Sequence, residues 1–288
     1  MLFRNGIIIF FQYISILLIS IKCSQINSRE ELIEYISKKE EVLNIQNEIT
    51  IEDSSIININ SKKISILGSS KNSVIKFVNN NLTNMIFQED CNKIEIKNIK
   101  IEGNFKFINN KNIIFDNVLY NGYFISKNEN PSINSTLQIL DSEFKLSNQD
   151  NGYEIYNYNL DINNSQFYGN DHYNLYLMKY INQKDNFKYL TINGTLFSGN
   201  YYNTGFYGKY SEVTITHSKF EKFYSGRALN SGGALNLEST NNIIKSIEFE
   251  DNYSESSGGS LYLKCSPNTE IRIISFKNTT STESVFFN

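Results

Sequence analysis

The chain has 288 residues and a net charge of −3, with 40% hydrophobic and 20% charged residues. This composition excludes a disordered chain. The presence of only four arginines argues against nucleic-acid binding, because phosphate and base recognition depend largely on arginine. Ile is the most frequent apolar residue, with many Phe and Tyr, and Asn and Ser dominate the polar content. β-Branched and aromatic residues favour strands, and Asn and Ser favour turns, so we expect an all-β fold with many short turns.

Residues 1–23 have the pattern of a secretory signal peptide. Arg4 supplies a positive charge, Gly6 to Ile21 form an apolar run, and cleavage is expected after Cys23. The run is shorter than the ~20 residues that a helix needs to cross a bilayer, so we expect a cleaved signal rather than a membrane anchor. No later run is apolar enough to span a membrane. The mature chain is therefore expected to be secreted or exposed at the cell surface, without a membrane span.

Residues 24–48 are predicted to form a helical N-terminal cap, with the helical pattern over residues 28–44. Ser28 and Glu31 have the spacing of a capping box. The apolar residues expected on one helix face are Leu32, Ile33, Ile36 and Leu43. We expect this helix to cover the first strands of the repeat described next, because open strand edges promote aggregation. A helix that binds a partner is the alternative.

From residue 49 onward a short pattern recurs: apolar, any residue, apolar, and then a further apolar residue five positions later. Six clear copies, 19 to 30 residues apart, begin at Ile94, Ile113, Leu137, Leu160, Leu190 and Val213. Alternation with a period of two predicts short strands with one face inward. Stacked coils of roughly 20–30 residues with two or three such strands are typical of a parallel β-helix. We therefore expect the second apolar residues to form one interior file: Ile96, Phe115, Ile139, Ile162, Ile192 and Ile215.

One position in each copy, four residues after its start, is small or polar. It is occupied by Asn98, Asn117, Asp141, Asn164, Gly194 and His217. Asn and Gly tolerate left-handed backbone, so we expect this position to bend the chain between two strands. Equivalent side chains would then stack and share amide hydrogen bonds as a structural ladder, with His217 substituting for an amide. A second recurring asparagine, three residues after the last apolar position, is found at Asn104, Asn170, Asn200 and Asn252. The last copy of the repeat is shortened, with Ile271, Ile273 and Phe276 inward.

Two double glycines, Gly232-Gly233 and Gly258-Gly259, are 26 residues apart, and each directly precedes a strand-like run, ALNL or SLYL. We expect each pair to form the same corner on neighbouring coils, where positive φ or close backbone approach requires glycine. A phosphate-binding loop would instead be followed by a helix.

GGALNL and GGSLYL, interleaved with FEDN and FKNT, resemble the GGA-aliphatic and F-x-x-N repeats of polymorphic outer-membrane proteins. The glycine repeats cover about residues 220–280, and the looser strand periodicity covers about residues 49–288. The resemblance implies that residues 49–288 form a right-handed parallel β-helix of the pectate-lyase-like superfamily. The Ile-, Asn- and Lys-rich style, as in SKKISILGSSKNSVIKF, is also similar to β-helical surface and scaffoldin-type proteins of anaerobic gut fungi.

Tyrosines are the candidate ligand-binding residues, because a tyrosine ring has a flat apolar face and a polar tip that suit stacking on sugar rings or contact with protein. The candidates are Tyr153, Tyr156, Tyr158, Tyr201, Tyr202, Tyr207 and Tyr210. The alternative is that alternate tyrosines fill or flank the coil. We expect a non-catalytic adhesion or scaffold protein that binds polysaccharide, glycoprotein or partner proteins along the solenoid.

The alternative function is a polysaccharide lyase or glycoside hydrolase on the same fold. Hydrolases of the superfamily need clustered aspartates and a histidine between glycines, and the lyases need acidic Ca²⁺ ligands. The chain has no Asp-Asp pair, and its two histidines, His172 and His217, lack flanking glycines. We therefore predict no catalytic residue, metal ligand or cofactor, with Asp171 and His172 as the alternative acid–base pair.

Six N-x-S/T sequons agree with secretion: Asn81, Asn134, Asn163, Asn193, Asn252 and Asn278. We expect some of them, not all, to carry sugar, because some would fall on buried strand ends. Cys91 and Cys265 are too few for a disulfide framework and are expected to be buried thiols.

Overall fold

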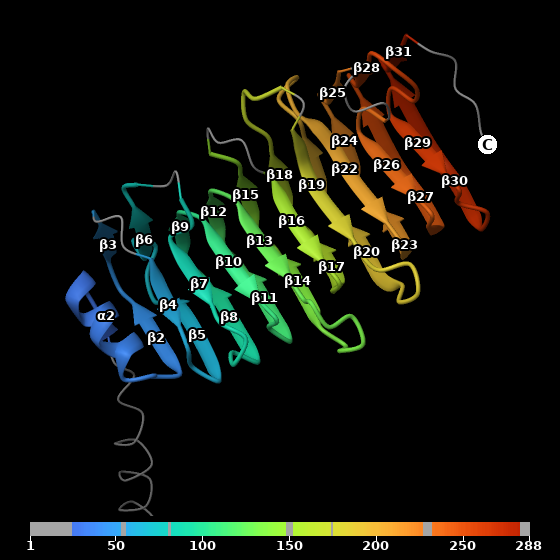
Figure 1. The fold of residues 1–288 in the computed structure, drawn as a ribbon. Helices are drawn as coiled ribbons and strands as arrows, with labels where there is room; N and C mark the ends of the chain where they lie inside the picture. The colour runs from blue at the N-terminus through green and yellow to red at the C-terminus, as the bar shows by residue number, and fades with distance from the viewer. Residues whose placement is uncertain are drawn as a thin grey trace, which may run out of the picture.

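The computed structural model describes residues 25–52, 56–79, 82–147, 152–173, 175–226 and 232–282. Over these residues the chain is a parallel β-solenoid, elongated along its axis, with the helix α2 (Arg29–Ser37) at its N-terminal end (Figure 1). The predicted signal peptide of residues 1–23 and the sequon at Asn81 lie outside the described residues. Within the described part of the chain, no helix has the length and apolar character needed to cross a membrane.

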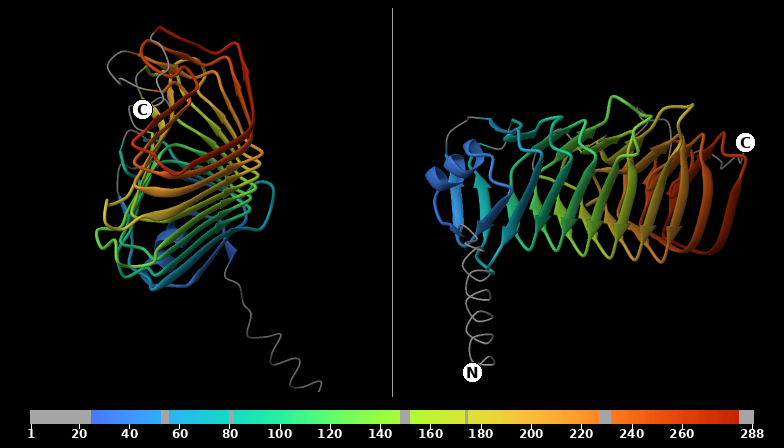
Figure 2. Two further views of the ribbon diagram at one scale, coloured as in Figure 1. Left: turned by 90° about the vertical axis from the view of Figure 1, so that its right-hand side faces the viewer. Right: turned by 90° about the horizontal axis from the view of Figure 1, so that it is seen from below.

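Three faces of parallel strands run along the solenoid, and Figure 2 shows their coils stacked one on another. The first face consists of β2 (Val42–Ile45), β5 (Lys63–Gly68), β8 (Lys93–Lys97), β11 (Asn112–Asp116), β14 (Thr136–Leu140), β17 (Asn159–Asn163), β20 (Lys188–Asn193), β23 (Ser211–Thr216) and the first parts of β27 (Asn241–Glu250) and β30 (Thr269–Lys277). The short strand β1 (Gln25–Ile26) pairs with β2.

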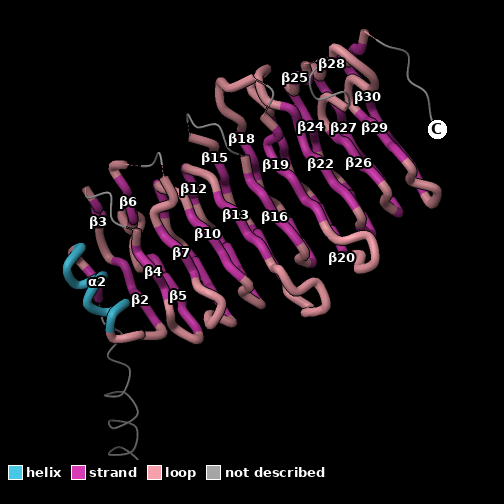
Figure 3. The backbone as a smooth tube through the Cα atoms, viewed as in Figure 1, coloured by secondary structure: helices cyan, strands magenta, loops and turns pink. Residues whose placement is uncertain are grey.

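The second face consists of β3 (Glu48–Ile51), β6 (Val74–Phe77), β9 (Lys100–Glu102), β12 (Leu119–Asn121), β15 (Glu143–Lys145), β18 (Gln166–Tyr168), β21 (Leu196–Ser198), β24 (Lys219–Glu221) and the second parts of β27 and β30. The third face is a sheet of nine strands: β4 (Ile57–Ile59), β7 (Met85–Phe87), β10 (Phe105–Ile108), β13 (Phe124–Lys127), β16 (Tyr153–Tyr156), β19 (Tyr176–Ile181), β22 (Thr204–Lys209), β26 (Leu235–Glu238) and β29 (Leu261–Lys264). Between the second and third faces, β25 (Tyr224–Ser225), β28 (Tyr253–Ser254) and β31 (Thr280–Ser281) form a small sheet. The loops lie at the corners of the stack (Figure 3).

The register of the first face confirms the repeat that the periodicity predicts. Each second apolar residue lies opposite its counterpart in the next coil, and all six side chains are fully buried: Ile96, Phe115, Ile139, Ile162, Ile192 and Ile215. Burying such a side chain contributes about 1.5–3 kcal/mol, so the interior file is a main source of stability.

The third apolar position of the repeat forms a column of aromatic rings on the second face. Neighbouring ring centroids are 4.9 to 5.5 Å apart and the rings are stacked at interplanar angles of 6 to 27°. The column consists of Tyr120, Phe144, Phe167, Phe197, Phe220, Phe249 and Phe276. The periodicity predicts an apolar residue at this position, but it does not predict that the rings stack.

All six residues of the predicted bend position have left-handed backbone, with φ between 46 and 60°: Asn98, Asn117, Asp141, Asn164, Gly194 and His217. Each of them lies between a first-face strand and a second-face strand. Among the described side chains only one pair at this position is hydrogen-bonded, Asn117 Nδ2 donating to Asn98 Oδ1 at 2.8 Å. The column is therefore a series of backbone bends rather than a continuous amide ladder.

Buried hydroxyl groups follow the bend, and sequence analysis does not identify them. The Ser142 hydroxyl accepts from the Val118 N–H at 3.0 Å, and the Ser165 and Ser218 hydroxyls accept in the same way from Ser142 and Thr195. The bend interrupts the strand ladder, and a buried N–H must find another acceptor. The hydroxyls therefore complete the hydrogen bonding at the corner.

The N-terminal helix is shorter than predicted. It ends at Ser37, and residues 42–45 form β2 instead, with Leu43 buried opposite Ile66 of the next coil. The β-branched residues around Leu43 favour a strand once a neighbouring strand is present to pair with it. The capping interaction is as predicted, since the Ser28 hydroxyl accepts from the Glu31 N–H at 3.2 Å. The helix lies over the first coils, with Leu32 fully buried (Figure 2).

The predicted inward alternation of the last copy is wrong at Ile273. Ile271 pairs with Ile244 and Ile274 with Ile247, which places Ile273 at the bend with φ 55° and 80% exposure. A β-branched residue is strained in left-handed backbone. The thiols also differ from expectation, because Cys91 is buried whereas Cys265 is exposed.

The double glycines have two different physical roles. Gly232 and Gly258 have positive φ values of 38 and 66°. Gly233 and Gly259 instead allow close approach, since a Cβ on Gly233 would lie 2.1 Å from the Gly259 carbonyl oxygen and a Cβ on Gly259 2.2 Å from that of Thr280. Each pair thus provides one turn and one backbone contact between coils.

Candidate binding face

Aromatic side chains are distributed unequally along the solenoid. From Phe77 to Phe144, every described Phe and Tyr is at most 6% exposed. From Tyr156 onward, many aromatic rings lie at least partly on the outer surface: Tyr156, Tyr168, Tyr173, Tyr176, Phe187, Tyr189, Tyr201, Tyr202, Tyr207, Tyr210, Tyr224, Tyr253 and Tyr262. Exposed aromatic residues of this density mark an interaction surface more often than a solvated one.

Four of these residues, Tyr156, Tyr176, Tyr207 and Tyr210, form what we call the tyrosine face, on the outside of β16, β19 and β22 and at the end of β22. Tyr176 and Tyr207 lie on neighbouring coils with ring centroids 5.5 Å apart. Strand alternation places them outward, because Tyr207 pairs in register with Lys179, whereas the flanking Phe206 is buried. The sheet therefore holds these rings at fixed positions on successive coils.

Two glutamates organise the polar groups of the tyrosine face. Glu154 accepts hydrogen bonds from the Tyr156 hydroxyl at 2.9 Å and from Lys179 Nζ at 3.1 Å. Glu238 accepts from the Tyr207 hydroxyl and from Lys209 Nζ, both at 2.9 Å. Each carboxylate thus neutralises one lysine and fixes one tyrosine.

The hydroxyls of Tyr156 and Tyr207 remain protonated at neutral pH. Burial, together with the nearby Glu154 carboxylate, raises the pKa of Tyr156 to about 12. Burial and the hydrogen bond to Glu238 raise the pKa of Tyr207 as well. The lysines lie close to aromatic rings, with Lys179 Nζ 6.0 Å from the Tyr176 centroid and Lys209 Nζ 5.0 Å from the Tyr210 centroid. The face is therefore a set of neutral rings among paired charges.

A second group of tyrosines follows the corner between the second and third faces, and we call it the tyrosine row. Tyr173 contacts Tyr202 with centroids 4.7 Å apart and Tyr224 with centroids 5.6 Å apart. Tyr224 in turn stacks on Tyr253 at 5.6 Å. Tyr173 is 60% exposed, so the row has a ring surface that is open to solvent. The row connects successive coils along the axis.

Buried asparagines hold the loops that carry the row. Asn203 Nδ2 donates to Asn170 Oδ1 at 2.9 Å, and the Asn170 N–H donates to Asn203 Oδ1 at 2.6 Å. A Cβ on Gly169 would lie 1.9 Å from Asn203 Oδ1, so glycine is required there. Asn200, the recurring asparagine of this coil, does not take part in this pairing: it is exposed, and Asn203 occupies the buried position because the intervening residues form a turn.

Asn252 has the same function two coils further on. Its Oδ1 accepts from the Phe223 N–H at 3.0 Å, and its Nδ2 donates to the Phe220 carbonyl at 3.0 Å. Tyr224 and Tyr253 follow these residues directly in sequence. The buried amide thus fixes the backbone next to both rings.

The prediction of a ligand-binding role is wrong for two of the tyrosines, because Tyr153 and Tyr158 are fully buried. The Tyr153 ring contacts Phe124 and Phe144, and the Tyr158 hydroxyl donates to the Asn110 carbonyl at 2.8 Å. They fill the coil, as the alternative interpretation proposed. In the structure Tyr153 and Ile155 point inward. From the segment NGYEIYNYN alone, it could not be determined which alternate residues face the interior.

The other predicted tyrosines are on the surface, in three places. Tyr156, Tyr207 and Tyr210 belong to the tyrosine face, and Tyr202 belongs to the tyrosine row. Tyr201 is 53% exposed, next to the row in sequence. Sequence analysis missed Tyr173, Tyr176, Tyr224 and Tyr253, because they lie outside the two tyrosine-rich segments, residues 152–160 and 201–210, and meet the other rings only through the stacking of coils.

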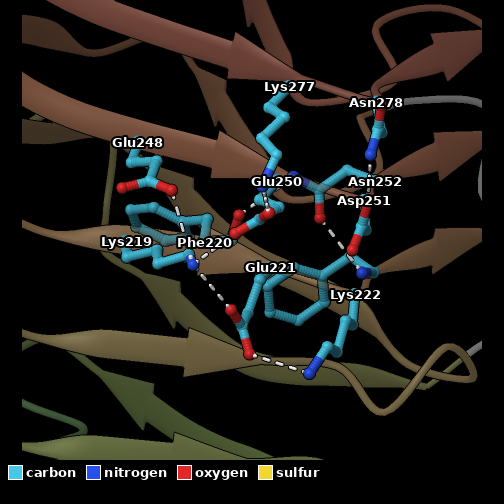
Figure 4. Close-up of polar contacts among 11 residues, drawn as sticks. Lys219, Phe220, Glu221, Lys222, Glu248, Glu250, Asp251, Asn252, Lys277 and Asn278 are labelled. Atoms are coloured by element: carbon cyan, nitrogen blue, oxygen red, sulfur yellow. Dashed lines mark hydrogen bonds and ion pairs between the residues drawn. The ribbon is translucent and has the colours of Figure 1, made fainter.

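A cluster of charged residues lies on the second face near the C-terminal end (Figure 4). Lys219 Nζ is 3.0 Å from Glu221 and 3.4 Å from Glu248, and it also bonds to Glu250, which contacts Lys277. Hydrogen bonds from Lys219 and Lys277 lower the pKa of Glu250 to about 2. The lysines bridge carboxylates on neighbouring coils, so the cluster connects coils and its charges are paired.

The predicted acid–base pair is placed in an exposed loop, where Asp171 Oδ1 accepts from Asn200 Nδ2 at 2.7 Å. His217 is at a bend, with Nδ1 3.3 Å from Asn193 Oδ1. No group of three or more His, Cys, Asp or Glu residues suited to a metal ion is found in the described ranges.

The five sequons within the described residues differ in exposure. Asn252 is 1% exposed, so the folded chain has no room for a sugar at this residue, and it is one of the sequons expected to stay unmodified because of burial. Asn134 and Asn278 are exposed. Asn163 and Asn193 are half-buried and pair in register on neighbouring strands.

A shallow groove of ≈ 580 Å³ is present on the first face. Residues that line it include Tyr189, Thr191, Glu212, Thr214, Asn241 and Glu270. Tyr189 is 67% exposed, and it is the groove's single aromatic side chain among the described residues. The groove is therefore a weaker candidate than the tyrosine face and the tyrosine row.

Comparison of the chain with protein-family models, with curated proteins and with solved structures finds no match.

Proposed function

We propose that this protein is a non-catalytic glycan-binding protein, and that the tyrosine face and the tyrosine row are its binding surface. The observation that carries the proposal is the confinement of surface aromatic rings to the coils from Tyr156 onward, whereas the coils before them keep their rings inside. An exposed tyrosine ring offers an apolar face to the C–H groups of a sugar and a hydroxyl to its polar edge.

The arrangement of the rings favours a long ligand. The tyrosine row follows the axis over several coils, and solenoids use such extended surfaces to bind elongated partners. The sheet and the hydrogen bonds to Glu154 and Glu238 hold the side chains before any ligand arrives. Little conformational entropy is then lost on binding, which favours affinity.

We further propose that the protein acts outside the cell, as an adhesion or scaffold protein. The apolar run of Gly6 to Ile21 supports secretion, and the resemblance of the glycine repeats to polymorphic outer-membrane proteins supports a surface role on a pectate-lyase-like right-handed β-helix. The Ile-, Asn- and Lys-rich composition, which is similar to that of scaffoldin-type proteins, also supports this role.

The proposal is tested by applying the mature chain to a glycan array and, in parallel, incubating it with pectin, xylan and alginate. We expect binding to glycans on the array and no release of reducing ends or unsaturated products. Release of such products would establish the alternative, a carbohydrate-active enzyme. Capture of a protein partner from an extracellular fraction, without any glycan binding, would contradict the glycan assignment.

A further inference from the structure

We infer that the ligand of the tyrosine face is an uncharged polysaccharide that lies parallel to the solenoid axis across β16, β19, β22 and β26. This inference rests on the proposed function and specifies its ligand. It is carried by the pairing of charges on the face and by the register of the residues that make the face.

The cationic groups of the tyrosine face are already neutralised. Lys179 is 3.1 Å from Glu154, and Lys209 is 2.9 Å from Glu238. Both pairs are largely shielded, with side-chain exposures between 21 and 34%. An anionic sugar such as a uronate would have to displace a glutamate from its lysine, and it would then lie next to that carboxylate. Like charges at such distances are unfavourable, so the face selects against polyanions.

The polar atoms that remain suit hydroxyl groups. The Tyr156 and Tyr207 hydroxyls donate to carboxylates, so their oxygens can accept a hydrogen bond from a ligand. Carboxylate oxygens also accept several hydrogen bonds at once. A neutral sugar supplies hydroxyl donors at these places and C–H faces for the rings, whereas a carboxylate or sulfate supplies only acceptors.

The register sets the direction of the ligand. Glu154, Lys179 and Tyr207 pair in line on β16, β19 and β22. Tyr156 and Lys209 lie in the adjoining line, and Glu238 of β26 continues it. Strands lie about 4.7–4.9 Å apart, so a chain along the axis contacts a new set of side chains at every coil. A chain along β22 would contact Tyr207 and, at the end of the strand, Tyr210, but it would not extend over the rings of both β16 and β19.

The test is affinity electrophoresis of the mature chain in native gels that contain xylan, galactomannan or a neutral β-glucan, and in gels that contain polygalacturonate or alginate. We expect at least one neutral polysaccharide to retard the protein, with a Kd that changes less than about twofold between 50 and 500 mM NaCl. Preferential retardation by a polyuronate, weakened by salt, would overturn the inference but leave the glycan-binding proposal intact. Failure of every glycan to retard the protein contradicts the proposed function itself.

Three variants locate the site and keep the test independent of folding. Tyr207→Ala should weaken binding about tenfold or more, whereas Tyr207→Phe, which keeps the ring, should stay within about threefold of the unmodified chain. Tyr189→Ala is the matched control, since it removes an exposed tyrosine from the first face. Loss of binding in Tyr189→Ala but not in Tyr207→Ala would place the ligand in the first-face groove and overturn the inference. Circular dichroism confirms that each variant is folded.

A fourth variant tests the role of charge pairing. Glu238→Gln leaves Lys209 without its carboxylate partner and is expected to create measurable retardation by polygalacturonate at 50 mM NaCl. If polygalacturonate binds the unmodified chain as well as it binds this variant, charge pairing does not determine the choice of ligand, and the inference is wrong.

Discussion

The coils from β7 to β15 and the coils from β16 onward use aromatic residues differently: the first group buries its rings, whereas the second group also carries rings on its outer surface. In the first group, Phe87, Phe105, Phe107, Phe115 and Phe124 form a dense internal cluster of stacked and edge-to-face rings. The outer side of the third face there carries aliphatic residues and lysines, such as Ile86, Lys106 and Ile125. In the second group the rings of the tyrosine face and the tyrosine row lie on the outer surface.

This difference separates stability from binding within one architecture. Interior aromatic pairs contribute about 0.5–1.5 kcal/mol each beyond the burial of their area, so we expect the internal cluster to make the first coils the more stable half. The later coils also bury rings beside their column of phenylalanines, namely Tyr153, Tyr158, Tyr180, Phe206 and Phe223, but unlike the first coils they present further rings to solvent. Residues exposed in this way add little to folding and are available for a ligand.

The largest effect that would test this comparison is the removal of an internal ring. Phe115→Ala is expected to destabilise the fold by about 4–5 kcal/mol, because the Phe115 ring contacts four others, those of Phe107, Tyr120, Phe124 and Phe144. Phe220→Ala should cost about 3 kcal/mol, since Phe220 stacks on two rings only. Urea unfolding followed by circular dichroism measures both, and equal losses would contradict the division of stability.

A smaller effect is expected where the tyrosine row is anchored. Gly169→Ala places a Cβ against Asn203 and should destabilise the chain by about 1–3 kcal/mol, because the pair of Asn170 and Asn203 must move. The affinity of this variant for glycan should fall as well. Gly208→Ala, whose Cβ would meet only side-chain atoms at 2.9 Å and beyond, is the control and should be milder. A variant that loses stability but keeps full binding would show that the row is not part of the site.

Relief of backbone strain at the last bend should increase the free energy of unfolding by about 1 kcal/mol. Ile273 has φ 55° and is 80% exposed, so replacing it by asparagine removes an unfavourable backbone conformation and no core contact. Ile273→Asn should raise the midpoint of thermal unfolding, while Ile273→Val, which stays β-branched, should leave it unchanged. A lower midpoint for the asparagine variant would contradict the backbone explanation.

The smallest expected effect is the acid sensitivity of the charged cluster on the later coils. The folded pKa of Glu250, about 2, is below its ordinary value of about 4.3, so its contribution to stability is complete above the ordinary value and is lost as pH falls towards 2. Hydrogen exchange between pH 5 and pH 2.5 should show earlier opening of β24, β27 and β30 than of β11 and β14. In Glu250→Gln this acid-dependent difference should be reduced, and an unchanged profile would rule out Glu250 as its cause.

The interior of the solenoid was predictable from sequence because its rule is local. A two-residue period of Ile, Leu and Phe fixes which side chains point inward, and Asn or Gly at a constant spacing marks the bend. The pairing register of the first-face strands follows from this pattern, so the alignment of Ile96, Phe115 and Ile139 could be predicted from the sequence.

The binding surface was less predictable because it depends on phase and on contacts between coils. In NGYEIYNYN several positions are aromatic, so the pattern alone does not distinguish the buried Tyr153 from the outward Tyr156. Tyr173 and Tyr224 are 51 positions apart in the chain, yet their rings touch because the corners of successive coils coincide. The segment from Val42 to Ile45 is too short to show a clear strand pattern in the sequence. Its pairing with β5 determines that it forms a strand.

The spacing between aligned residues on the first face ranges from 19 to 30 positions, yet the pairing continues without a break. Extra residues are accommodated at the corners, where loops form at small cost in chain entropy and without disturbing the strands on either side. Length changes in the segment between β18 and β19, which carries Tyr173, are therefore separable from the stacking of Phe167 on Phe197. The geometry leaves the surface free to vary over a core that stays the same.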